Sequence, residues 1–195
     1  MNYDQVYYVM APSYSDENEF IHVTPTEQTG NRRFHYRELT YGEPPVNFVL
    51  NDAVDSNVTS PMYFCKPSII VSEELGRLLE DKIYGGKLYP ASLSNDNTAF
   101  DGYLLVNIYE DLDCWCRKES VYKQKDPDYY PRVYQYRIDS KVIEKIDEER
   151  RLVFRMGGSD LSPVIVHEKV KNIVEKKMDN VNFFSIQDYF FGDEY

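Results

Sequence analysis

The residues best equipped for chemistry are three histidines and three cysteines, and their spacing forms no recognised site. His22, His35 and His167 are far apart in the chain and lack the spacing of metal ligands. Cys114-Trp115-Cys116 brings two thiols together, but this short pattern is a weak metal signal, and Cys65 is distant from both. We therefore expect structural or surface cysteines and no metal site.

A catalytic site would need an activated nucleophile or a pair of acids. The sequence has no Gly-x-Ser-x-Gly, P-loop or Gly-x-Gly-x-x-Gly motif. Gly157-Gly158-Ser159-Asp160 precedes an apolar strand pattern, which favours a tight turn over a phosphate-binding loop. Asp111, Asp113 and His167 leave an atypical hydrolase open as a minor alternative. The main expectation is a protein with no catalytic residue and no cofactor.

The charge favours a protein partner over nucleic acid. The chain has 33 acidic and 22 basic residues, a net charge of −11, and the excess lies in its first two thirds. Such a field repels phosphates and attracts cationic proteins, although the same charge also serves solubility. The 18 tyrosines have two equally good explanations. They could form a protein interface, or they could be strand residues that pack one edge of the ring inward. The candidate partner-binding residues are Asp16, Glu17, Glu19, Asp188, Asp193 and Glu194.

Length and apolar pattern suggest a single cytoplasmic domain. The 195 residues contain no apolar run of the roughly 18 residues that a membrane helix needs, and the N-terminus lacks a secretory signal. Three cysteines favour a reducing compartment. Within one domain we distinguish a strand-and-loop region (1–60), a core (61–187) and an acidic, aromatic tail (188–195).

The elements that would position these residues include an internal repeat. Residues 68–91 (SIIVSEELGRLLEDKIYGGKLYPA) align without gaps with residues 163–186 (PVIVHEKVKNIVEKKMDNVNFFSI). Each copy predicts a buried strand, a helix with an apolar stripe, and a second strand. Ser72 is a good helix N-cap, whereas His167 at the matching position is a poorer one.

The rest of the chain adds further strands. The near-continuous apolar run at 103–109 predicts a central strand. Ser140 is expected to cap a charged helix through Glu149. Other expected strands cover residues 5–10, 46–50, 132–138 and 152–156. The predicted fold class is α+β, a mixed or antiparallel sheet with two repeat-related strand–helix–strand units.

Several of these segments resemble a known family. PSIIVSEEL at 67–75, YLLVN at 103–107, VFRM at 153–156, VIVHEKV at 164–170 and NFFSI at 182–186 are similar to the motifs of a bacterial immunity-protein family of polymorphic toxin systems. Tyr7-Tyr8-Val9, Asp111-Leu112-Asp113 and Ser120 fall in the same order. The chain departs from the family at His167, where serine is usual, and in the charged stretch 144–151.

The resemblance implies a cytoplasmic, non-enzymatic protein that binds and neutralises a cognate toxin. The acidic charge leads us to expect a basic toxin, with no nucleic-acid or membrane partner. A small regulatory or scaffold module that binds a different protein through the same surface remains the alternative.

Overall fold

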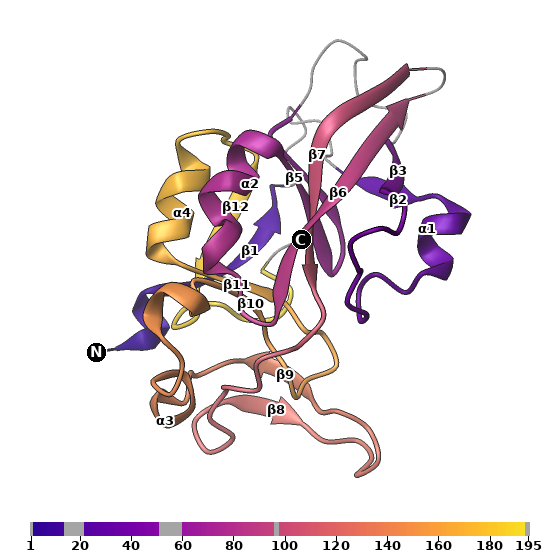
Figure 1. Cartoon of the computed structure of the whole chain (residues 1–195). Coiled ribbons are helices and arrows are strands. Elements are labelled where there is room, and N and C mark those ends of the chain that lie inside the picture. Colours follow the sequence, from indigo (N-terminus) through magenta and orange to yellow (C-terminus); the bar gives the residue numbers. More distant parts are fainter. Residues whose placement is uncertain (1, 14–21, 51–59, 96–97, 194–195) are drawn as a thin grey trace.

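The computed structural model describes residues 2–13, 22–50, 60–95 and 98–193. It is a mixed α+β structure built mostly of strands (Figure 1). The strands are β1 (Tyr7–Pro12), β2 (Val23–Pro25), β3 (Val46–Leu50), β4 (Met62–Cys65), β5 (Ser68–Ser72), β6 (Gly86–Asn95), β7 (Thr98–Ile108), β8 (Val121–Lys123), β9 (Arg132–Gln135), β10 (Val153–Arg155), β11 (Val164–His167) and β12 (Val181–Ser185). The helices are α1 (Glu27–Asn31), α2 (Glu73–Leu79), α3 (Ser140–Ile143) and α4 (Glu168–Glu175), with 3-10 turns η1 (Tyr3–Gln5), η2 (Glu80–Lys82) and η3 (Glu148–Arg151).

The strands form two larger sheets and a ribbon. Six strands pair in the order β2-β3-β6-β7-β5-β4, and the bridge between His22 and Phe64 brings the two edge strands together, so this sheet nearly closes into a barrel. Among its ladders in the described residues, β3–β6 is parallel and the others are antiparallel, and the closing His22–Phe64 bridge is parallel as well. The second sheet is antiparallel, in the order β10-β11-β1-β12, and β8 pairs with β9. The expected mixed sheet is therefore confirmed.

The two similar sequence segments both fold as strand–helix–strand. The helices begin at Glu73 and Glu168, and the second strands begin at Gly86 and Val181, so both pairs of start points are 95 residues apart. In each unit the two strands flank a third strand that is antiparallel to both, β7 in the first unit and β1 in the second. The helices α2 and α4 lie side by side (Figure 1).

Strand alternation divides the apolar side chains among three clusters. In β5, Ile70 belongs to the cluster inside the barrel-like sheet, whereas Ile69 and Val71 belong to the cluster between the two larger sheets. Both faces of this strand are therefore buried. That explains why its sequence is an unbroken apolar run without the alternation typical of a half-exposed strand.

The second sheet is also covered on both faces. In β11, Val164 and Val166 join the central cluster, together with the apolar stripes of α2 and α4. Ile165 faces the opposite way, toward a third cluster that includes the buried Trp115. The ribbon β8–β9 and α3 lie on this side of the molecule (Figure 1).

One expected helix needs correction, and one short helix was not expected. The segment after Asp139 forms only the four-residue α3, and Asp139 caps it by accepting a hydrogen bond from the Lys141 amide (2.9 Å); the expected cap, Ser140, lies inside the helix. The Arg151 side chain donates to the Ile143 carbonyl, which takes up one of the free acceptors at the end of α3. The helix α1 has five residues, which is too short for the apolar periodicity that predicts a helix.

No helix in the described ranges is long and apolar enough to cross a membrane.

Candidate functional site

Two of the candidate partner-binding carboxylates meet at the surface beside β12. Asp188 and Asp193 are exposed, and both line a shallow depression with Tyr8, Phe183 and Phe184. We refer to these five residues as the acidic edge surface. The other candidates, Asp16, Glu17, Glu19 and Glu194, lie outside the described residues.

The segment after β12 is fastened by local hydrogen bonds. The Ser185 hydroxyl donates to Asp188 Oδ2 (2.6 Å), and the Phe190 amide donates to Asp193 Oδ2 (2.7 Å). The Phe191 amide donates to the Tyr134 carbonyl of β9 (2.7 Å). Both carboxylates are thereby held in place, and neither has an ion pair within the described part of the chain.

The cation next to this surface is neutralised locally. The Lys171 ammonium lies 5.4 Å from the Tyr8 ring centre and 5.9 Å from that of Phe183. It also pairs with Glu175 on the next turn of α4 (2.8 Å). The acidic edge surface therefore keeps its negative sign, over aromatic rings that offer contact area to a partner.

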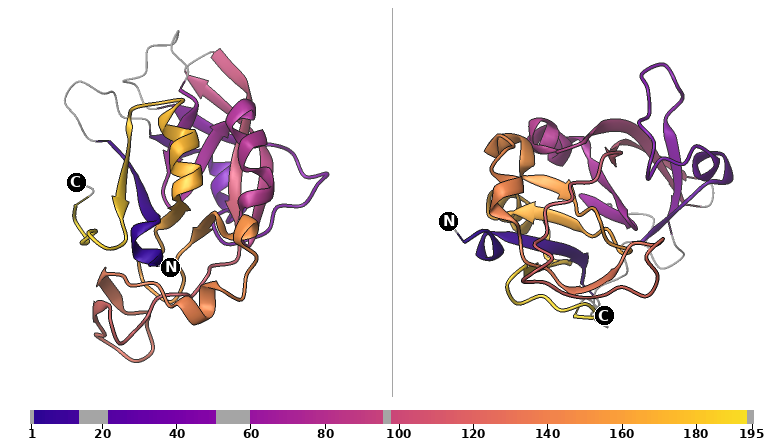
Figure 2. Two further views of the ribbon diagram at one scale, coloured as in Figure 1. Left: turned by 90° about the vertical axis from the view of Figure 1, so that its left-hand side faces the viewer. Right: turned by 90° about the horizontal axis from the view of Figure 1, so that it is seen from below.

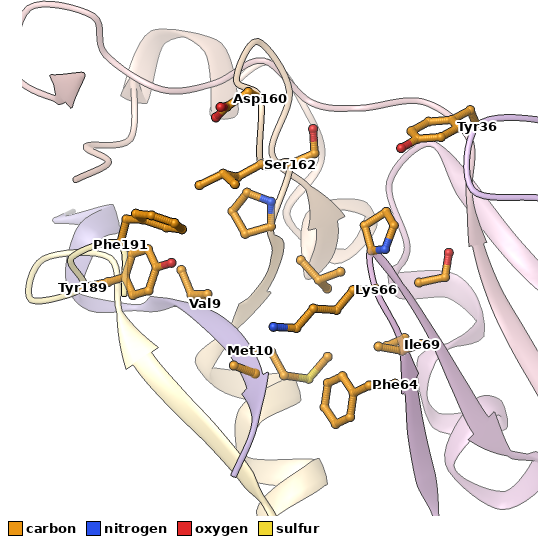
Figure 3. A pocket seen from close by; sticks show the side chains of 16 residues that line it. Val9, Met10, Tyr36, Phe64, Lys66, Ile69, Asp160, Ser162, Tyr189 and Phe191 are labelled. Atoms are coloured by element: carbon orange, nitrogen blue, oxygen red, sulfur yellow. The ribbon is translucent and has the colours of Figure 1, made fainter. Parts of the chain in front are cut away.

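A cavity of about 270 Å³ lies between β1 and β11 of the second sheet and β4 and β5 of the barrel-like sheet. Figure 3 shows Val9, Met10, Phe64 and Ile69 on its walls and the Lys66 side chain extending into it. Apolar walls with few polar groups are typical of sites that hold a ligand or an anchoring side chain. This cavity could not be predicted from the sequence, because its lining comes from segments far apart in the chain.

Asn107 fastens the loop of residues 34–39 that leads to the rim of the cavity. Its fully buried amide accepts a hydrogen bond from the Leu39 amide (2.9 Å) and donates to the carbonyls of Phe34 (2.8 Å) and Arg37 (3.1 Å). A polar residue inside the apolar run of β7 must find such partners. The position of Asn107 within an apolar run can be seen in the sequence, so its need for partners was predictable.

Arg155 holds the same loop from the second sheet. Its buried guanidinium pairs with the Asp111 carboxylate, donates to the His35 carbonyl (2.5 Å) and lies 5.2 Å from the Tyr36 ring centre. The Tyr36 side chain is 69% exposed and lines the cavity. Two polar residues from the family-like motifs, Asn107 and Arg155, thus position a loop that presents a tyrosine.

The three residues of the hydrolase alternative are each engaged elsewhere. Asp111 pairs with Arg155, and both oxygens of Asp113 accept hydrogen bonds from Arg117 (2.5 Å each). The Nδ1 atom of His167 accepts a hydrogen bond from the Lys169 amide (3.1 Å) at the start of α4. The three side chains have separate partners, and their roles are ion pairing and helix capping.

One pair that the sequence did not suggest is His35 with Ser68. His35 Nδ1 lies 2.8 Å from Ser68 Oγ. Burial and then the charge of Arg155 lower the pKa of His35 to about 4, so its imidazole is neutral at pH 7. Because no carboxylate contacts this ring in the described residues, the pair ties the loop to β5 without forming a triad.

The three cysteines are free thiols. Cys65 and Cys114 are buried and Cys116 is half-buried. Burial raises the pKa of Cys65 to about 11, which keeps this thiol protonated. Within the described ranges, no group of three or more His, Cys, Asp or Glu side chains is placed to hold a metal ion.

Comparison with known proteins adds one finding to this geometry. Residues 13–188 match the model of a family described as "Immunity protein family (Imm11)". No curated protein matches the chain.

Proposed function

The chain belongs to the Imm11 immunity protein family, and on this premise we propose that it neutralises its cognate toxin through the acidic edge surface. Family membership implies a toxin partner and protection without catalysis. The observation that carries the proposal is the match over residues 13–188, which covers most of the chain. The separate engagement of Asp111, Asp113 and His167 agrees with a role in binding.

The proposed toxin is basic. A net charge of −11 steers a cationic partner toward the protein and raises the association rate. Asp188 and Asp193 supply exposed carboxylates at one place, and neither forms an ion pair with another described residue. If the toxin is a nuclease, these carboxylates occupy the positions of substrate phosphates. Asp16, Glu17, Glu19 and Glu194, which lie outside the described residues, are proposed to contact the toxin as well.

Three further proposals concern the chain as a whole. We place it in the cytoplasm, supported by three free thiols. We treat it as one domain, supported by the central cluster that both larger sheets share. We regard the two strand–helix–strand units as repeats of one another, supported by their common 95-residue offset and their matching strand pairing.

Co-expression with the neighbouring toxin-like reading frame tests the function. Cells that express this frame alone should die, and cells that also express the chain should survive. Survival of neither culture, or of both, contradicts the proposal. An unrelated neighbouring gene would favour the scaffold alternative.

Charge reversal tests the surface. Asp188→Lys with Asp193→Lys should slow association with the purified toxin by roughly tenfold at low salt and reduce its salt dependence. The matched control is Asp81→Lys with Asp101→Lys, which makes the same charge change at exposed positions outside the acidic edge surface. Equal association rates for the two double variants, measured by stopped-flow fluorescence, would show that the surface is wrongly placed.

A further inference from the structure

The strand β12 has an open edge, whereas the other edges of the larger sheets are met by neighbouring chain. In the four-stranded sheet, β12 pairs with β1 on one side, and no strand within the described residues lies on its other side (Figure 2, left). At the opposite edge, Ile83 bridges Val153 of β10, and the Tyr84 amide donates to the Val153 carbonyl (2.8 Å). In the barrel-like sheet, β2 and β4 meet through His22 and Phe64.

The hydrogen bonds to β1 fix which backbone groups of β12 point outward. The Ile186 amide donates to the Tyr7 carbonyl (2.9 Å), and the Ser13 amide donates to the Asn180 carbonyl (3.0 Å). In an antiparallel pair, alternate residues face the partner strand. With the register Val9 to Phe184, residues 180, 182, 184 and 186 therefore face β1, and residues 181, 183 and 185 face away.

We propose that this edge binds an extended, basic segment of the toxin as a fifth strand. The inference rests on the proposed function and deepens it. Exposed sheet edges are templates for pairing, and proteins usually cover or blunt them. Strand addition takes its affinity from main-chain hydrogen bonds. At β12 the central outward donor and acceptor belong to Phe183, and neither has a partner among the described residues.

The negative charge beside β12 indicates that the added strand is basic. Asp188 and Asp193 lie in the segment after β12, which ends at Ser185, and have no cationic partner in the described ranges. Lys or Arg side chains of an added strand would reach these carboxylates while its backbone pairs with Phe183. The Tyr8 and Phe183 rings on the same face offer apolar contact to the stems of such side chains.

Amide hydrogen exchange of the wild-type chain tests this geometry directly. The probe is a catalytically inactive form of the toxin that the co-expression test identifies. In the free chain, the amides of residues 182 and 184 should exchange slowly and that of Phe183 quickly. In the complex, the amide of Phe183 should slow by roughly tenfold or more. An unchanged rate for Phe183 overturns the inference, and the proposed function stands if the toxin is still neutralised.

A proline variant with a matched control provides the second test. Phe183→Pro removes the outward amide without breaking a bond to β1, whereas Phe183→Ala removes the same ring and keeps the amide. The proline variant should bind the inactive toxin roughly 10- to 100-fold more weakly than the alanine variant. Equal affinities of the two folded variants would contradict the fifth strand. If the proline variant does not fold, the exchange measurement decides alone.

Discussion

The second strands of the two strand–helix–strand units, β6 and β12, begin at matching positions but have different surroundings. β6 pairs with β7 along its length and with β3 from Ala91 onward. β12 pairs with β1 alone. Residues 86–90 of β6, which match β12 in the sequence, also pair with one strand only, and β3 joins where β6 continues past the matching segment. β6 thus becomes an interior strand through its extension, whereas β12 ends at Ser185 and stays an edge. The position of a strand within its sheet, more than its own sequence, determines whether its backbone is available to a partner.

The helices of the two units share geometry and differ in cap chemistry. The Ser72 hydroxyl accepts a hydrogen bond from the Leu75 amide (3.3 Å), whereas His167 uses its ring nitrogen to accept from the Lys169 amide. Both caps satisfy a free donor of the first helical turn. A histidine cap makes the second unit sensitive to pH, because protonation of Nδ1 removes the acceptor.

Proline substitution in the two strands should give the largest contrast in stability. Leu93 is buried in β6 between Phe48 of β3 and Phe100 of β7, so Leu93→Pro breaks a central ladder and leaves a cavity. Its expected cost is more than about 4 kcal/mol, enough to prevent folding. Relative to Phe183→Ala, Phe183→Pro should cost less than about 1 kcal/mol further. Urea unfolding measures both, and similar losses would remove the distinction between interior strand and edge.

The second largest contrast in stability is expected between β7 and β1, the strands that the two units flank. Asn107→Ala in β7 leaves three backbone groups without their partner in the buried interior, which should cost about 3 kcal/mol. In β1, Tyr7→Phe removes a single hydrogen bond to the Arg151 carbonyl, at about 1 kcal/mol or less. Thermal unfolding gives both values. If Asn107→Ala costs no more than Tyr7→Phe, the loop of residues 34–39 is not held as described.

Local structure was largely predictable from the sequence, and its assembly was not. The apolar runs predict β5, β7 and β11 correctly, because strands with both faces buried have near-continuous apolar sequences. The strand expected at 46–50 is β3, with the same bounds. Sheet order escaped prediction because β1 lies between β11 and β12, strands from the other end of the chain. No local pattern encodes such long-range pairing.

The same limit applies to the site. Asp188 and Asp193 could be proposed as partner-binding residues from the sequence, because their acidic charge is a property of the residues themselves. The open edge beside them was hidden, because a strand is an edge only by virtue of its neighbours. The structural roles of Asn107 and Arg155 could have been predicted, because a buried polar side chain in an apolar strand must have hydrogen-bond partners.

The helix caps should give the smallest effects. Ser72→Ala and His167→Ala should each cost about 1 kcal/mol, because each removes one acceptor from a first helical turn. Urea unfolding at pH 7.5 measures both losses. A negligible loss for His167→Ala alone would show that α4 does not depend on its cap as α2 does.

The pH dependence separates the two caps. Burial lowers the pKa of His167 below 6.5, so as pH falls through 6.5 the unfolded chain binds a proton before the folded chain does. The stability that neutral His167 contributes is therefore present above pH 6.5 and is lost toward its lower folded pKa. His167→Ser, which copies the first cap, should lose less stability than wild type between pH 7.5 and 5. Parallel pH profiles for the two proteins would contradict this assignment.

The central claim is that the chain neutralises its toxin by binding, with no bond made or broken. Titration of the purified toxin's activity with the purified chain tests it most directly. We expect inhibition to rise linearly to a fixed stoichiometric ratio, with the toxin recovered at unchanged mass and full activity after the complex is dissociated. Complete inactivation at a small fraction of that ratio, or a toxin recovered with altered mass, would contradict the claim.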